Sequence, residues 1–218
     1  MVMPTPERSQ RSTPGLFTVT TILVAINLLA FVWELASGTD FSSNRSLYDH
    51  GALFGVAVQH GSWWRVVTGA FLHGGFAHVA LNMVALYVVG RDVEWLVGHW
   101  RMLAIYAIAL GGSGWAVVTF SPGDVTVGAS GAIFGLFGAL VAFGLRMGAR
   151  GRRLIAQMLP VLALNLAFTF AVPFISKAGH VGGLVSGFVA GLLLFAIRPE
   201  TATPPAPPLV LPEHASGA

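Results

Sequence analysis

Ser130 and His180 are the residues of this sequence whose types and positions are best suited to chemistry. Ser130 lies in the tetrad Gly128-Ala129-Ser130-Gly131 at the head of an apolar segment long enough to cross a membrane, and His180 lies at the head of another such segment. A hydroxyl or an imidazole in hydrocarbon is costly unless a partner satisfies it, so both positions need a functional explanation. A serine beside a histidine can act as a nucleophile with its base, and the pair predicts a serine hydrolase that works inside the bilayer.

The composition is that of a protein that crosses a membrane several times. Of 218 residues, 55% are hydrophobic and 10% are charged, and the mean hydropathy is +0.73. An ordinary soluble domain has roughly 25% charged residues. The chain has no cysteine, which excludes a disulfide, a thiolate metal site and a cysteine nucleophile. We expect a lipid bilayer as its surroundings and no nucleic-acid partner.

Six apolar segments are each near the roughly 20 residues that cross a bilayer. Because lipid offers the backbone no hydrogen-bond partners, each span is expected to be helical. The sequence therefore predicts an all-α membrane protein, a six-transmembrane-helix bundle whose long first loop, residues 36–75, lies in the outer membrane interface. The expected spans are 16–35, 76 to about 95, 102–120, 125–145, 154–172 and 180–197.

The basic residues predict the orientation of these spans. Nine of the twelve lysines and arginines fall on the amino-terminal side of the membrane and three on the other, a bias typical of cytoplasmic loops. We expect a multi-pass protein of a bacterial plasma (inner) membrane with both termini in the cytoplasm. The nine are Arg8, Arg11, Arg91, Arg101, Arg146, Arg150, Arg152, Arg153 and Arg198, and the three are Arg45, Arg65 and Lys177.

The ends of the chain differ from its middle in composition. Residues 1–15 and the proline-rich tail 198–218 have few side chains that could pack, so we expect disordered cytoplasmic ends. Residues 16–197 then form a single domain, and its first span is read as an uncleaved anchor.

In this orientation the second, fourth and sixth spans all begin at the outer surface. His78 and Asn82 lie in the first two turns of the second, Ser130 in the fourth and His180 in the sixth, so all four share one depth. Small residues predict that the fourth and sixth helices touch, because a smooth stripe lets two backbones approach closely. The stripes are Gly128, Gly131, Gly135 and Gly138 on the fourth span and Gly179, Gly183, Gly187 and Gly191 on the sixth.

The four polar residues expected at this depth include the groups that a serine hydrolase needs. His180 can take the proton of Ser130, while the backbone N–H of Ser130, His78 and the amide of Asn82 can face an oxygen that becomes negative. We expect no aspartate or glutamate to orient His180, so the sequence predicts a dyad without the acid of the soluble triad. Taken singly, each residue has a plainer interpretation, since a transmembrane serine, histidine or asparagine often only bonds a neighbouring helix.

These residues resemble the rhomboid intramembrane serine proteases. The matching motifs run in order through residues 16–197: Trp64-Arg65, His78-Val79-Ala80-Leu81-Asn82, Gly128-Ala129-Ser130-Gly131 with Ala132-Ile133-Phe134-Gly135, and Gly179-His180-Val181-Gly182-Gly183 with Gly187. The resemblance implies that Ser130 is the nucleophile and His180 the general base. It further implies that His78, Asn82 and the Ser130 amide, beside Gly128, form the oxyanion site. The family commonly has alanine where this chain has Gly179.

The resemblance also implies residues that support the site. These are Trp64 and Arg65 in the first loop, His73 five residues before His78, Glu94 at the inner end of the second helix, and Gly131, Gly183 and Gly187 at helix contacts. The implied substrates are single-span membrane proteins that enter sideways, with the fifth helix and its Pro160 beside the access route. Neither a metal nor a cofactor is expected, and the H-E-x-x-H pattern of a zinc protease is absent.

Two other functions fit parts of the pattern. A catalytically inactive rhomboid-like protein would bind transmembrane segments without cutting them, but it should lack one of the two catalytic residues. A small transporter would use the same polar groups to bind a solute, but it should carry a second polar layer on the inner side. The sequence therefore favours an intramembrane serine endopeptidase that cuts near the outer end of a transmembrane segment.

Overall fold

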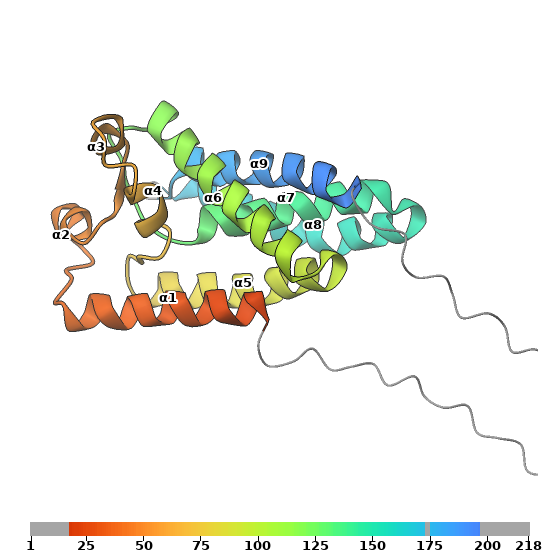
Figure 1. Cartoon of the computed structure of the whole chain (residues 1–218), viewed down its shortest axis with the longest axis horizontal. Coiled ribbons are helices and arrows are strands. Elements are labelled where there is room, and N and C mark those ends of the chain that lie inside the picture. The colour runs from red at the N-terminus through yellow and green to blue at the C-terminus, as the bar shows by residue number, and fades with distance from the viewer. Residues whose placement is uncertain (1–17, 173–174, 197–218) are drawn as a thin grey trace, which may run out of the picture.

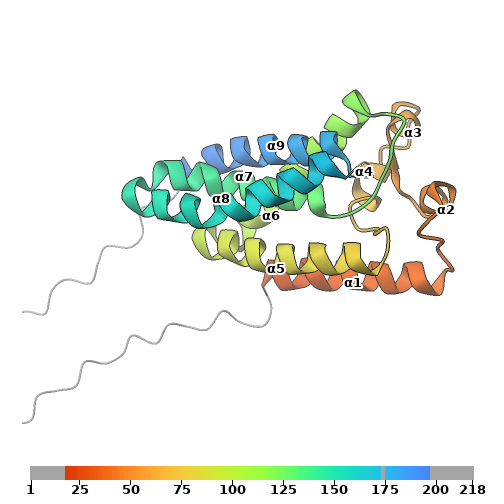
Figure 2. The same cartoon turned by 180° about the vertical axis from the view of Figure 1, so that it is seen from behind.

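Long α-helices make up most of the protein in a computed structural model that describes residues 18–172 and 175–196. Figures 1 and 2 show α1 and α5 side by side, with α7 packed against α6, α8 and α9. The long helices are α1 (Val19–Ala36), α5 (Phe76–Val97), α6 (His99–Phe120), α7 (Ser130–Arg146), α8 (Gly148–Ala171) and α9 (Lys177–Ala196).

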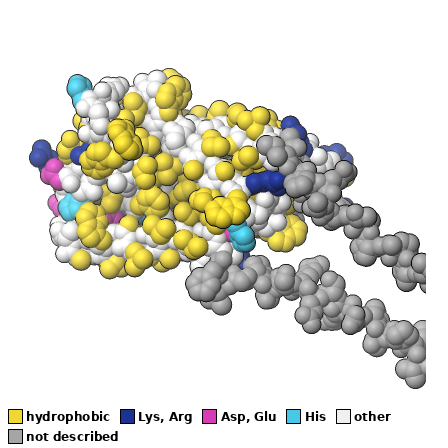
Figure 3. All heavy atoms as spheres, viewed as in Figure 1, with side chains coloured by type: hydrophobic (Ala, Val, Ile, Leu, Met, Phe, Trp, Pro, Cys, Tyr) yellow, Lys and Arg dark blue, Asp and Glu magenta, His cyan; other side chains and the backbone are white. Residues whose placement is uncertain are grey.

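Five helices among the described residues are long and apolar enough to cross a membrane: α1, α5, α6, α8 and α9. The seventeen-residue α7 is shorter, and nearly all of its side chains are buried by the surrounding helices. Hydrophobic side chains cover the sides of the bundle while lysine and arginine side chains gather toward its ends, as Figure 3 shows on one face. Such a surface fits lipid around the middle and water at both ends, so the fold is that of an all-α integral membrane protein.

The helix boundaries differ from the predicted spans in an instructive way. The fourth span was predicted to begin at 125, but Val125–Thr126 form strand β2, which pairs antiparallel with β1 (Leu53–Phe54), and α7 begins only at Ser130. Conversely, α8 and α9 begin several residues before the predicted 154 and 180. The span of apolar residues predicts which part of the chain lies in lipid. It does not predict the ends of a helix, because a helix can continue through polar residues beyond the lipid. An apolar pair can also belong to a strand instead of the helix.

The glycine stripes bring α7 and α9 into the predicted contact. A Cβ added at Gly183 would collide with the backbone of Gly131, and one added at Gly187 would collide with the backbone of Gly135. No side chain separates the two helices at these levels. Backbones that approach this closely gain van der Waals contact that larger residues would prevent, and they hold the amino-terminal ends of α7 and α9 together.

Residues 37–75 form a compact layer over one end of the bundle. This layer contains α2 (Asn44–Asp49), β1, α3 (Gly55–Gln59) and α4 (Arg65–Thr68). The buried Arg65 donates from Nη1 to the carbonyl oxygens of Tyr48 at 2.7 Å and Ala52 at 3.1 Å, and its guanidinium lies over the rings of Tyr48 and Trp64. Arg65 thus ties three parts of the layer together, because its planar group bonds and stacks at once.

Glu94 joins three helices at the opposite end of the bundle. Its carboxylate accepts the N–H of Val19 at 2.7 Å, and both the N–H and the hydroxyl of Thr20 at 3.0 Å and 2.6 Å, and it contacts the ring of His99 at the start of α6. The first N–H groups of a helix have no partners within it. Glu94 supplies them for α1 and links that helix to α5 and α6.

Candidate active site

Ser130 and His180 meet in the structure although they are fifty positions apart. The Oγ atom of Ser130 lies 2.7 Å from Nε2 of His180, within hydrogen-bond distance. Ser130 is the first residue of α7 and His180 is in the first turn of α9. The contact between Gly131 and Gly183 lies beside this pair and brings the two helix ends close enough for the side chains to bond.

Two further side chains hold the imidazole of His180. The ring of Phe134 stacks on it with centroids 4.3 Å apart and an angle of 21°. Phe134 follows Ser130 by one helical turn and therefore lies on the same face of α7. Thr169, near the end of α8, has its Oγ1 atom 2.8 Å from Nδ1 of His180. With a ring on its face and partners on both nitrogens, the 8% exposed His180 has a defined orientation.

His78 and Asn82 lie against Gly128, two residues before Ser130. A Cβ added at Gly128 would stand 2.7 Å from Nε2 of His78 and 3.1 Å from Nδ2 of Asn82, and the φ of +112° there favours glycine. The two side chains project from one face of α5, since they are four residues apart. The structure thus brings together the predicted residues of all three helices: His78, Asn82, Gly128, Ser130 and His180.

Both side chains on α5 have an N–H directed toward Gly128. The N–H of Gly74 donates to Nδ1 of His78 at 3.2 Å, so the hydrogen of a neutral His78 ring lies on Nε2, the atom that faces Gly128. The Nδ2 atom of Asn82 is buried and has no hydrogen-bond partner among the described residues. An unused buried donor is costly in a folded protein. This donor of Asn82 and the Nε2–H of the half-buried His78 lie beside the Ser130 segment, where they could stabilise a negative oxygen.

His73 packs against His78, and Glu34 in turn bonds the backbone of His73. The ring of His73 packs edge-on against that of His78 with centroids 5.3 Å apart, and both carboxylate oxygens of Glu34 lie 3.1 Å from the His73 backbone nitrogen. Burial, with a smaller effect of His78, lowers the pKa of His73 to about 4, so its ring is neutral at pH 7. Glu34 is not among the residues predicted from the sequence, although a carboxylate inside an apolar span is a visible signal.

The remaining predicted residues lie away from these side chains. Trp64 and Arg65 belong to the layer over the bundle, Glu94 lies near the carboxyl-terminal end of α5, and Gly187 lies one turn beyond Gly183 along α9. Thr169 was missed altogether. Nothing local distinguishes it from a threonine that bonds only its own helix, so the sequence carried no signal for its contact with His180.

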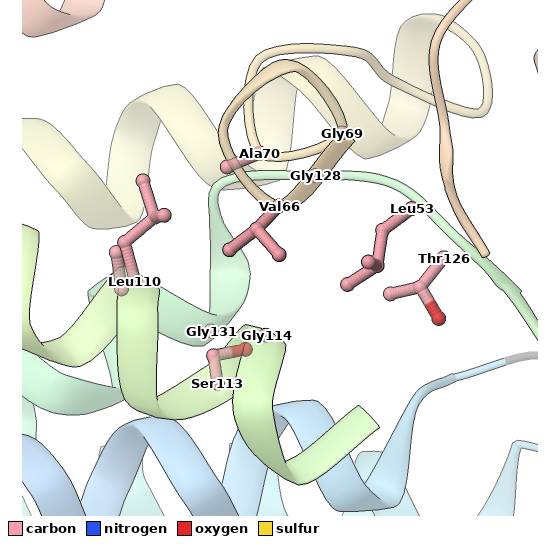
Figure 4. A pocket seen from close by; sticks show the side chains of 11 residues that line it. Leu53, Val66, Gly69, Ala70, Leu110, Ser113, Gly114, Thr126, Gly128 and Gly131 are labelled. Carbon is pink, nitrogen blue, oxygen red and sulfur yellow. The ribbon is translucent and has the colours of Figure 1, made fainter. Parts of the chain in front are cut away.

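A small cavity lies beside the segment that carries Ser130. Figure 4 shows Val66 and Ala70 on one side of it, Ser113 and Leu110 on the other, and Gly128 and Gly131 along its wall. Its volume of about 20 Å³ holds one water molecule on the scale of roughly 10–15 Å³ per water. The buried Oγ1 of Thr126, which has no partner among the described residues, lines the same cavity.

Comparison with known proteins matches the sequence of this region to a family. A family model described as the Rhomboid domain matches residues 60–197, which include every residue named above around Ser130 except Glu34. The chain belongs to the rhomboid family. It is therefore a multi-pass membrane protein of this family, and α4, α5, α7 and α9 all lie within the matched region.

Several curated rhomboid proteins are similar in sequence to this rhomboid chain. "Rhomboid protease GluP" of Bacillus subtilis is 38% identical over 81% of this chain and 35% of its own length. "RHOMBOID-like protein 5" of Arabidopsis thaliana is 36% identical over 69% of this chain and 50% of its own length. "Putative rhomboid protease YdcA" of Bacillus subtilis is 34% identical over 64% of this chain and 71% of its own length. The chain thus spans half or less of the length of the first two.

Proposed function

We propose that this rhomboid protein is an intramembrane serine endopeptidase that hydrolyses peptide bonds in or near transmembrane segments of single-span membrane proteins. The 2.7 Å contact between Ser130 Oγ and His180 Nε2, with two N–H donors beside it, carries this proposal. The names of GluP and YdcA, both called rhomboid proteases, add support.

The proposed reaction uses these atoms in two stages. Ser130 Oγ attacks the carbonyl carbon of the substrate while its proton passes to His180 Nε2. The carbonyl oxygen becomes negative and is stabilised by the N–H of Ser130, by Nε2–H of His78 and by Nδ2–H of Asn82. His180 then gives the proton to the leaving amine as the C–N bond breaks, and an acyl ester remains on Ser130.

Water completes the cycle by the same route. His180 takes a proton from the attacking water, the ester bond breaks, and the proton returns to Ser130 as the carboxylic acid leaves. The cavity lined by Gly128 and Gly131, on either side of Ser130 in the sequence, is large enough to hold one water molecule. Inside a membrane, such a local supply matters because the surrounding lipid holds almost none.

The proposal includes a six-helix domain spanning residues 16–197. The seventeen residues of α7 extend about 25 Å at 1.5 Å per residue, which crosses most of a hydrocarbon core of about 30 Å. The uneven distribution of lysine and arginine supports cytoplasmic termini and a site that opens to the outside of a bacterial plasma membrane. The expectations for residues 1–15 and 198–218 lie outside the described residues.

Substrates are proposed to approach through the lipid beside α8. This helix exposes many large side chains, among them Leu159, Val161, Leu164 and Phe168, and it contains Pro160. A peptide bond in a helix is shielded by its own hydrogen bonding, so cleavage requires local unwinding. Cuts are therefore expected near the outer end of the substrate, at a small residue beside glycine or proline.

Labelling with a fluorophosphonate probe tests the proposal directly. The purified protein in detergent should be labelled, Ser130→Ala should not be labelled, and His180→Ala should react much more slowly, because only an activated serine attacks such a probe. Cleavage of a single-span protein in liposomes should follow the same order. An unlabelled and inactive wild type would instead favour an inactive rhomboid-like protein that only binds transmembrane segments.

A further inference from the structure

Thr169 joins α8 to the imidazole of His180. Its side chain is buried, with 1% exposed. The Oγ1 atom lies 2.8 Å from Nδ1 of His180 and also 2.8 Å from the backbone carbonyl oxygen of Asn165, one turn earlier in α8. The hydroxyl therefore lies between a carbonyl oxygen, which can only accept a hydrogen bond, and a ring nitrogen, which can either donate or accept one.

Counting hydrogens decides which tautomer this geometry favours. A threonine hydroxyl has one hydrogen, and two oxygens 2.8 Å apart attract each other only if that hydrogen lies between them. Thr169 thus donates to the Asn165 carbonyl, and its Oγ1 accepts from Nδ1–H of His180. The neutral ring then has its lone pair on Nε2, the atom that faces Ser130 Oγ. In the other tautomer, with the ring hydrogen on Nε2, one of the contacts that His180 and Thr169 make would contain two hydrogens or none, and so could not be a hydrogen bond.

We propose that Thr169 is a positioning residue that holds His180 in the tautomer able to accept the Ser130 proton. The proposal rests on the proposed function of the Ser130–His180 pair and adds a third member to it, supplied by α8. In a soluble triad a carboxylate orients the histidine and also stabilises its cation. A neutral hydroxyl that is already bonded to a carbonyl orients the ring but adds little charge. Its removal should therefore lower kcat by less than the roughly 10⁴-fold fall seen when a triad aspartate becomes asparagine.

Kinetics of Thr169 variants test this role. Thr169→Val replaces the hydroxyl by a methyl group of similar size, and kcat for a transmembrane substrate should fall about 10-fold to 100-fold while KM stays nearly constant. Thr169→Ser keeps the hydroxyl and should retain most of the wild-type kcat. Thr119→Val is the matched control, because the Thr119 hydroxyl also bonds a carbonyl one turn earlier, that of Trp115 at 2.8 Å, but lies on the exposed side of α6.

A spectroscopic readout separates positioning from general damage. In protein with ¹⁵N-labelled histidine, the ring signals of His180, identified by their absence in His180→Asn, should have hydrogen on Nδ1 and none on Nε2. Thr169→Val should shift this balance toward the other tautomer, while Thr169→Ser and Thr119→Val leave it unchanged. This measurement does not depend on turnover.

The outcomes distinguish failure of this proposal from failure of the proposed function. Unchanged kcat and unchanged ring signals in Thr169→Val overturn the positioning role even if the wild type is an active protease. Equal loss of kcat in Thr169→Ser and Thr169→Val also overturns it, because packing rather than the hydroxyl would then matter. A wild type that cleaves nothing, but whose His180 tautomer depends on Thr169, would instead overturn the protease proposal and leave the hydrogen-bond assignment standing.

Discussion

Gly128 lies so close to His78 that a Cβ at position 128 would stand 2.7 Å from Nε2 of the imidazole. The Nδ2 atom of Asn82 would lie 3.1 Å from the same Cβ. A side chain at this position would fill the space in which, under the proposed mechanism, a substrate oxygen meets both donors. The backbone φ of +112° adds strain for any residue other than glycine.

Gly128→Ala should therefore lower kcat by at least the roughly 10²-fold to 10³-fold that one lost oxyanion donor costs. Labelling by a fluorophosphonate, whose oxygen occupies the same space, should slow in parallel. Gly123→Ala is the matched control in the same connection, because nothing lies within 4 Å of a Cβ added there and no positive φ is recorded. Full activity of Gly128→Ala would place the oxyanion elsewhere.

Asn82→Leu should separate activity from stability. The Nδ2 atom of Asn82 is buried without a partner among the described residues, so its removal leaves no bond broken in the resting protein. Replacing an unsatisfied polar group by an apolar one of similar volume is neutral or stabilising. We expect kcat to fall about 10²-fold to 10³-fold, with KM nearly constant and the thermal midpoint in detergent unchanged or higher. A lower midpoint with unchanged kcat would mean that Asn82 is structural.

His73 should make the protein less stable in acid. Its pKa is about 4 in the folded protein, compared with an ordinary value of 6.5, so the unfolded chain binds the extra proton between these values. This contribution is fully present above pH 6.5 and is lost as the pH falls toward 4. From pH 7.5 to pH 5 the loss amounts to about 2 kcal/mol in the free energy of unfolding.

Thermal unfolding in detergent at the two pH values measures this effect. The buried ring of His73 has no hydrogen-bond partner on either nitrogen among the described residues. In His73→Leu the leucine side chain therefore fills the same buried space without breaking a hydrogen bond, and it has no group that titrates. The wild type should lose more stability on acidification than this variant. Equal losses in both proteins would assign the acid sensitivity to other groups.

Glu94→Ala should weaken the fold without touching the chemistry. Its carboxylate accepts from the N–H groups of Val19 and Thr20 at the start of α1, and these donors would lose their partner. An unpaired buried donor costs about 1–3 kcal/mol, so the thermal midpoint should fall while kcat of the remaining folded protein stays the same. The exposed neighbour Asp92, changed to alanine, is the control and should unfold like the wild type. A selective loss of kcat in Glu94→Ala would contradict a structural role.

Much of the architecture could be predicted from the sequence. Runs of apolar residues predict helices because lipid leaves the backbone no other partner, and five helices among the described residues have the length to cross. The sequence predicts one depth for Ser130, His180, His78 and Asn82, because each lies near the start of a span expected to enter from the same side. The glycines at 131 and 183 identify the touching helices, because close backbone approach requires small residues.

Only the tertiary structure decided which atoms meet. Glu34 reaches the N–H of His73, Gly74 orients the ring of His78, and Thr169 bonds Nδ1 of His180, and each contact joins groups whose pairing depends on helix rotation or loop path. Hydropathy and small-residue spacing are properties of one segment and can be read along the chain. A hydrogen bond needs placement within a few tenths of an ångström, which is set by the packing of all the helices together.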